Sequence, residues 1–478
     1  MKSAKQNNRV RPDRLVRCGK DEFILNLVHM IAIFLILIIG LLTTPAMQFI
    51  SLFTVFGIYL ISAISVRASG PIHLDIVFLF FLFIYSFSVP LSASLSENSF
   101  DKEVIWKAAE ICLLGYTGFS FGMLLDSGQH RRIAEVGRID EKSAKLMRKS
   151  GMWIFVIGVF ASIAAIVLTS GISAYLSAGY AGRALLKRDA GPVELGLYFS
   201  IVGLFAVFAS TILSDGKQRV SKAFVTLVFL VFFFYISFLG IRRPLFLLGV
   251  GLLSGYSLIR HRPKLGIALS IGVISFVFLT TFAQYRQLIS SAGVEETIVF
   301  IQDNASLEWL DVSNTELGAP FRTLTDHIQG QSINDGLLFG SSYVQTFLYV
   351  LPSRITGGLE SLSVEYTNRF FASDFIAIGG NMGLFPVTEA YLNFGRTGVL
   401  FLFGIIGFCL ARTNRWFHGV GRGKIQYIVV YMTLVPWAAF FMRLDMASVS
   451  KGFLYSQIVP FIFVLLFFQL YRQIRNVS

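Results

Sequence analysis

The sequence predicts an all-α polytopic integral membrane protein with about twelve transmembrane helices and one large external loop. Of its 478 residues, 54% are apolar and only 14% are charged, and 48 are Phe, a composition far from that of soluble proteins. The apolar runs recur at about 20 residues, the length at which a helix crosses a bilayer core of about 30 Å. A soluble fold is therefore excluded.

Twelve apolar segments come close to this length. The first follows a basic segment and has no small-residue cleavage site after it, so we interpret it as a retained signal anchor. The twelve segments lie near residues 24–41, 46–66, 72–94, 104–125, 151–169, 193–214, 222–240, 244–259, 265–284, 386–411, 425–442 and 453–471.

The basic residues predict the orientation. With both termini in the cytoplasm, the inner segments hold 27 of the 41 Lys and Arg but 8 of the 28 Asp and Glu, as the positive-inside rule requires. The net charge of +13 is thus a topology signal spread over short loops, without a nucleic-acid-binding module. The predicted division is an inner tail (1–22), helices one to nine (23–285) with a short external loop (170–192), a large external loop (286–385), helices ten to twelve (386–471) and an inner tail (472–478).

The large loop has the pattern of a folded insert. Residues Val294–Gln302 and Asn314–Ile328 are predicted to be short amphipathic helices, the second capped by Ser313 with Glu316 three residues on. Residues 337–352 are too apolar for water, and we expect them to lie on the membrane surface as a roof over a cavity. The three cysteines, Cys18, Cys112 and Cys409, offer this loop no disulfide framework.

External cations are mainly arginines. Outside the cytoplasm Arg outnumbers Lys by 10 to 4, and residues 286–396 contain five Arg and no Lys. The planar guanidinium suits bidentate phosphate contacts, although pairing with loop carboxylates remains an alternative for each. The candidate substrate-binding residues are Arg183, Lys187, Arg242, Arg243, Arg286, Arg322, Tyr343, Arg354, Asn393 and Arg396.

Two of these arginines precede an unusually short span. Pro244–Ile259 has 16 residues, about 24 Å as a helix, which is less than the hydrocarbon core. Arg242 and Arg243 are thereby drawn below the outer surface, where a charge is costly and usually functional. Snorkelling of both side chains to the headgroups is the alternative. A lipid diphosphate, with anionic oxygens at headgroup depth and a long tail, would fit such a cluster.

The tenth span has a polar stripe. If it starts at Pro386, then Glu389, Asn393 and Arg396 lie on one face of its outer half. A carboxylate, an amide and a guanidinium should face the bundle and an external cavity rather than lipid. Mutual pairing of Glu389 and Arg396 is the structural alternative.

Several motifs together carry a family resemblance. They are Gly340-Ser341-Ser342-Tyr343, Leu351-Pro352-Ser353-Arg354, Gly379-Gly380 and Glu389-Ala390-Tyr391-Leu392-Asn393-Phe394-Gly395, with the Arg pair at 242 and 243. In these motifs and in its layout of spans and two external loops, the chain resembles Wzy-type O-antigen polymerases, which join oligosaccharide repeat units.

The resemblance implies a bacterial glycosyltransferase with a GT-C-like fold in the inner membrane. It would join undecaprenyl-diphosphate-linked repeat units on the periplasmic side, with a Wzz-type chain-length co-polymerase as partner and without cofactor or metal. The sequence agrees with the last point, since it has no Asp-x-Asp and no His-Glu-x-x-His motif. Arg242, Arg243, Arg354 and Arg183 would stabilise the leaving diphosphate. Glu389 is the first candidate for the base, followed by His327 and Asp326.

Two other functions stay open at this stage. An O-antigen ligase would share the donor and architecture but transfer polymer to lipid A core. A lipid-linked oligosaccharide flippase could also bind diphosphate with intramembrane arginines, yet it should carry charged residues through both membrane halves. Here the inner halves of the spans are almost wholly apolar, with Asp75 the main exception.

Overall fold

In the residues that the structure describes, the chain is helical and contains no strand. The structure is a computed structural model. It describes residues 12–40, 43–66, 72–95, 101–127, 140–169, 171–177, 191–213, 242–259, 318–330, 336–371, 383–419 and 423–477, and residues 223, 226–232 and 234 between them.

Nine of the described helical stretches are long and apolar enough to cross a membrane, and α10 is a shorter apolar helix. The predicted polytopic fold is confirmed, whereas the predicted segments near 222–240 and 265–284 lie largely or wholly outside the described residues. The spanning helices are α1 (Pro12–Gly40), α2 (Pro45–Val66), α3 (Leu74–Leu95), α4 (Lys102–Ser127), α5 (Glu141–Thr169), α8 (Gly191–Leu213), α18 (Pro386–Gly419), α19 (Ile425–Phe440) and the succession of α20 (Met446–Phe453), a π-helical turn (Leu454–Ile458) and α21 (Val459–Val477), with α10 at Arg242–Ile259.

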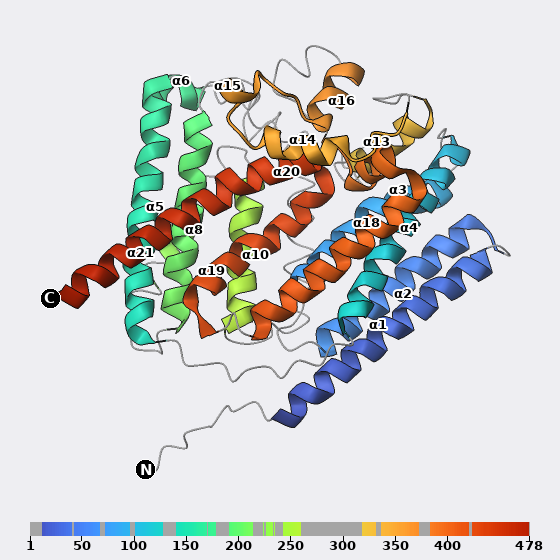
Figure 1. Ribbon diagram of the computed structural model, residues 1–478, viewed down its shortest axis with the longest axis horizontal. Coiled ribbons are helices and arrows are strands. Elements are labelled where there is room, and N and C mark those ends of the chain that lie inside the picture. Colours follow the sequence, from blue (N-terminus) through green and yellow to red (C-terminus); the bar gives the residue numbers. More distant parts are fainter. Residues whose placement is uncertain are drawn as a thin grey trace, which may run out of the picture.

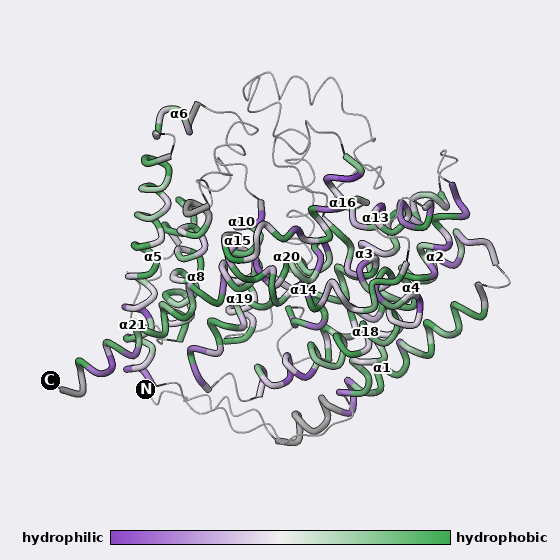
Figure 2. Tube along the Cα trace, turned by 45° about the horizontal axis from the view of Figure 1, so that its top comes forward, coloured by the Kyte–Doolittle hydropathy of each residue, from purple (hydrophilic) through white to green (hydrophobic). Residues whose placement is uncertain are grey.

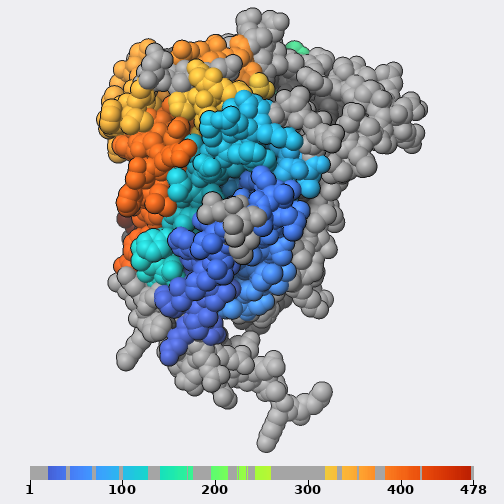
Figure 3. All heavy atoms as spheres, turned by 90° about the vertical axis from the view of Figure 1, so that its right-hand side faces the viewer, coloured from blue at the N-terminus to red at the C-terminus, as the bar shows by residue number. Residues whose placement is uncertain are grey.

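Short helices gather at one end of this bundle (Figure 1). They are α6 (Ile172–Ser177), α13 (Gly318–Ile328), α14 (Ser341–Tyr349), α15 (Ser353–Thr356) and α16 (Leu362–Phe370). In Figure 2 the spans are mostly green, whereas purple stretches gather towards their ends and on the short helices. Figure 3 shows α13, in yellow, beside the light-blue end of α3 and α4, with which it is in contact.

The predicted loop helix ending at Ile328 is confirmed as α13, and its described part begins at Gly318. The predicted cap at Ser313 and the predicted helix Val294–Gln302 lie outside the described residues. The apolar segment 337–352 contains α14, whose Ser342 and Thr346 are buried while Val344 and Phe347 are exposed, the latter by 80%. This one-sided apolar exposure is typical of a helix at a membrane surface.

Glycines let the spans approach each other closely. A Cβ at Gly118 or Gly122 of α4 would lie 2.2 Å from the carbonyl oxygen of Leu400 or 2.0 Å from that of Gly404 in α18. The same holds between α5 and α8, where Gly158 and Gly196 face each other. Backbone contact of this kind drives helix association in lipid, where burial of apolar side chains contributes little. These two helix pairs position the bundle beneath the short helices.

Replacing one of these glycines by a larger residue should destabilise the protein. Gly122→Ala should lower the free energy of unfolding by about 1 to 3 kcal/mol, because backbone atoms of α18 occupy the space of the new methyl group. Thermal unfolding of the detergent-purified protein would measure it. Gly57→Ala on α2 is the control, since nothing lies within 4 Å of its Cβ position. Equal midpoints for both variants would contradict the close contact of α4 and α18.

Candidate active site

A break in α18 organises the end of the bundle at which the short helices gather (Figure 1), which the sequence predicts to be the outer end and which keeps that name below. Gly395 has φ 67° and ψ −162°, outside the helical region, so the carbonyl groups of the preceding turn are not all used within the helix. Leu338 and Phe339 donate their backbone N–H groups to the carbonyl oxygens of Leu392 and Asn393, both at 3.0 Å. The break therefore attaches the segment before α14 to the span.

Asn393 completes this attachment. Its Oδ1 accepts the N–H of Gly340 at 2.9 Å, and its Nδ2 donates to Ser342 Oγ and to the carbonyl oxygen of Glu389, both at 2.8 Å. Asn393 is fully buried, and these bonds use its amide on both sides. Its position fixes the first turn of α14 against the outer part of α18.

Glu389 lies one turn before Asn393 and is only 2% exposed. Its Oε1 accepts the hydroxyl of Ser342 at 2.8 Å, and its Oε2 accepts the N–H of Met446 at 2.7 Å. The carboxylate thus joins α18 to the first turns of α14 and α20, and it faces the bundle as the stripe predicted. Neither oxygen is left without a donor.

A second carboxylate lies beside it. Asp445 immediately precedes α20 and is 1% exposed. One oxygen accepts the hydroxyl of Ser363 on α16, whereas Oδ2 has no hydrogen-bond partner. Burial raises the pKa of Asp445, and the bond from Ser363 lowers it by less. Sequence analysis missed this residue, although an acidic residue in the short external segment between spans eleven and twelve was a signal for it.

Asp326 and His327 belong to a neighbouring cluster on α13. Asp326 accepts the hydroxyl of Tyr366 on α16 and lies 3.6 Å from Nε of Arg322, so its carboxylate ties α13 to α16. His327 packs edge-on against Tyr391, its Nδ1 has no hydrogen-bond partner, and burial lowers its pKa.

This cluster adjoins the buried carboxylates. Thr323 of α13 shares a 3.0 Å hydrogen bond with Thr388, the residue before Glu389. Tyr343 lies on the α14 side, stacked on Phe394. Burial, and after it the neighbouring Glu389, raise the pKa of Tyr343. The structure thus brings α13, α14, α16 and α20 together around the outer end of α18.

Arg243 is held at the other end of α20. Its guanidinium lies 4.5 Å from the ring centroid of Trp437 and 5.4 Å from that of Phe440. Its Nη2 would be 2.7 Å from a Cβ at Gly452 of α20. Nε and Nη2 are buried and have no hydrogen-bond partner. The aromatic rings stabilise the positive charge of the guanidinium but form no hydrogen bonds with these N–H groups. The N–H groups can therefore still bind a ligand.

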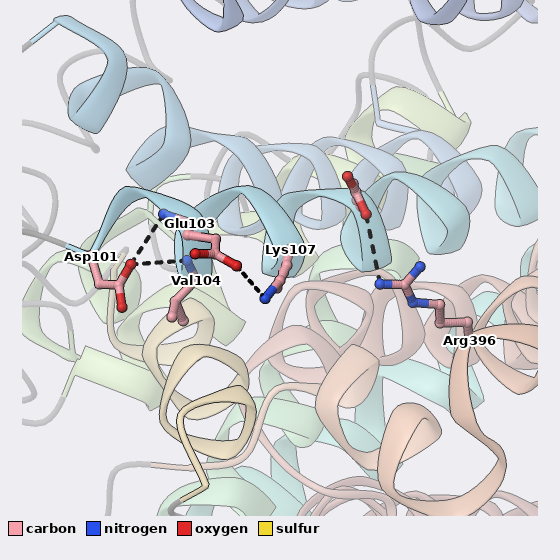
Figure 4. Close-up of polar contacts among 6 residues, drawn as sticks. Asp101, Glu103, Val104, Lys107 and Arg396 are labelled. Atoms are coloured by element: carbon pink, nitrogen blue, oxygen red, sulfur yellow. Dashed lines mark hydrogen bonds and ion pairs between the residues drawn. The ribbon is translucent and has the colours of Figure 1, made fainter.

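Arg396 does not join this site. It follows the break at Gly395, its side chain is 57% exposed, and its nearest carboxylate is that of Glu110 on α4 at 3.7 Å (Figure 4). The prediction that Arg396 lies on the same helix face as Glu389 and Asn393 is therefore wrong. It assumed a continuous helix, whereas α18 is broken at Gly395. Glu389 and Arg396 do not pair.

Some predicted residues are beyond what the structure describes. Arg183, Lys187 and Arg286 lie outside the described residues. Arg242 begins α10 and Arg354 lies in α15, but only their backbones are described. Among the described residues, no group of three or more His, Cys, Asp or Glu side chains is placed to hold a metal ion.

Among the comparisons with known proteins, a family model gives a match, and this match includes the described site. No curated protein and no solved structure matches the chain. A family model does match, over residues 24–474, from the first span to the last helix. It therefore includes the broken span, both buried carboxylates and Arg243. The chain belongs to the family described as O-antigen polysaccharide polymerase Wzy.

Proposed function

We propose that this protein polymerises undecaprenyl-diphosphate-linked oligosaccharide repeat units at the periplasmic face of the bacterial inner membrane. Family membership over residues 24–474 carries the proposal. The concentration of polar, buried groups at the external end of the bundle supports it, because that end is opposite the basic inner loops. Both termini would lie in the cytoplasm, and a Wzz-type co-polymerase would set chain length.

The proposed reaction is a glycosyl transfer with a diphosphate leaving group. A hydroxyl oxygen of the acceptor unit forms a bond to the anomeric carbon of the donor, and the bond from that carbon to the diphosphate oxygen breaks. The electron pair leaves with the diphosphate, so negative charge grows there in the transition state. A prepositioned cation stabilises this state more than the ground state.

Arg243 is the described cation best suited to this role. Its guanidinium carbon lies over the ring of Trp437, and its buried Nε and Nη2 have no hydrogen-bond partner. Unpaired buried donors are costly, so an anionic ligand would recover that free energy. Arg242, Arg354 and Arg183 remain proposed companions of Arg243 around the diphosphate.

The function as a whole is tested in the host. Deletion of the gene should collapse the ladder of surface polysaccharide to a single repeat per core on a gel, and expression of the protein should restore the ladder. Loss of every repeat from the core would instead indicate a ligase. Unchanged banding would reject both functions.

The role of Arg243 predicts that its charge alone is insufficient. Arg243→Lys should lose polymerisation nearly as completely as Arg243→Ala, by about 100-fold or more, because an ammonium replaces neither the fork nor the stacked plane. Polymer formed from lipid-linked repeat units by equal amounts of membrane-inserted protein measures this. Arg472→Lys, an exposed change on α21, is the control. Full activity of Arg243→Lys would show that Arg243 contributes only its positive charge.

We further propose that the transfer needs no metal ion, because the sequence lacks the Asp-x-Asp and His-Glu-x-x-His motifs. The purified protein should therefore polymerise lipid-linked repeat units at the same rate in excess EDTA. Activity that is lost on chelation and restored by Mg²⁺ or Mn²⁺ would refute this.

A further inference from the structure

The two buried carboxylates at the outer end of α18 form a unit. Glu389 accepts the N–H of Met446, and Asp445 is the residue immediately before it. The two side chains are thus close enough for the charge of Asp445 to act on Glu389. Neither forms an ion pair with a described residue. Two close carboxylates do not both ionise readily.

The hydrogen bonds differ between the two members. Both oxygens of Glu389 accept from protein donors, Ser342 and Met446. Asp445 lies beside Ser448 of α20; its Oδ1 accepts the hydroxyl of Ser363, whereas its Oδ2 is buried without a hydrogen bond. An unpaired buried oxygen is costly. It is also the one oxygen of the pair that is free to accept a proton.

The position of Asp445 relates it to Arg243. Asp445 and Gly452 are seven residues apart, which places them on the same face of α20 and about 10 Å from each other. The guanidinium of Arg243 contacts Gly452 and also has unpaired nitrogens. One helix face therefore has an unpaired carboxylate oxygen at one end and an unpaired guanidinium at the other. A sugar whose diphosphate is bound at Arg243 would extend toward Asp445.

We propose that Asp445 is the general base of the transfer and that its Oδ2 accepts the proton of the attacking hydroxyl, with Glu389 as the neighbouring carboxylate that holds Asp445 and α20 in position. The inference rests on the proposed polymerase function and adds a residue to it. The acceptor O–H bond breaks, its proton moves to Oδ2, and the oxygen bonds to the anomeric carbon as the diphosphate departs. Glu389 keeps α14 and α20 in place and balances the charge.

The segment 361–370 that contains α16 lies against the carboxylate of Asp445. Both carboxylates are covered in this structure, and α16 contacts α20 through hydroxyl groups, from Ser363 to Asp445 and between Ser448 and Ser361. Tyr343 of α14 is a titratable neighbour of Glu389, and Arg443 lies two residues before Asp445 in the chain.

Steady-state kinetics of the full-length protein with lipid-linked repeat units test the pair. Asp445→Asn should lower kcat by about 100-fold or more with little change in KM, as expected for loss of a general base. Because the two residues act as one unit, Asp445→Asn combined with Glu389→Gln should lose no more than the worse single variant. A kcat of Asp445→Asn within about threefold of wild type, or losses that multiply in the double variant, would overturn the proposal.

A second variant keeps the test independent of folding defects. Ser363→Ala leaves both carboxylates but removes the hydroxyl that stabilises ionised Asp445. The pKa of Asp445 should rise, so the acid limb of the kcat profile should move to higher pH while the plateau stays near the wild-type value. Ser120→Ala, which removes a buried hydroxyl without a partner, should move nothing. An unshifted acid limb in Ser363→Ala would overturn the proposal.

The experiments distinguish failure of the proposed polymerase function from failure of the proposed role of Asp445. If wild-type protein does not lengthen lipid-linked repeat units, the polymerase function itself is wrong. If wild type polymerises and Asp445→Asn does so equally well, the function stands and Asp445 is not its base.

Discussion

The carboxylate of Glu389 holds the outer end of the molecule together. Its two oxygens accept hydrogen bonds from Ser342 and Met446, which begin helices separated by about a hundred residues of sequence. A buried carboxylate without donors would cost several kcal/mol, so these bonds fix where α14 and α20 start. The position of Asp445, and through α20 that of Gly452 and Arg243, depends on them.

Beneath this polar layer the bundle is assembled by a different interaction. Gly118 and Gly122 bring α4 onto the backbone of α18, and Gly158 and Gly196 bring α5 onto α8. Contact between backbones is possible without water and without burial of large side chains. At these two interfaces the close approach of the helices therefore rests on glycine and not on polar side chains.

Much of the fold could be predicted from the sequence because apolar length and loop charge are local properties. The nine described spans and the shorter helix α10 coincide with predicted segments, and α13 was predicted from its amphipathic pattern. Glu389 and Asn393 were predicted to face inward because neither suits a lipid-facing position. Arg396 was misplaced, because the helical periodicity used for it assumes an unbroken helix, whereas Gly395 has a positive φ. Asp445 was missed because only the folding of distant segments brings it beside Glu389.

The break in α18 also separates the part of the helix that carries Glu389 from the part that packs against α4. An uninterrupted α-helix transmits a twist at one end along its whole hydrogen-bond ladder. In α18 the ladder is interrupted at Gly395, between the turn that bears Glu389 and the stretch that α4 grips at Leu400 and Gly404. Nothing lies within 4 Å of the Cβ position of Gly395, but its φ of 67° is a conformation that favours glycine. The turns that carry Glu389 are therefore positioned by their bonds to α14 and α20, and the stretch on the other side of the break by its contact with α4.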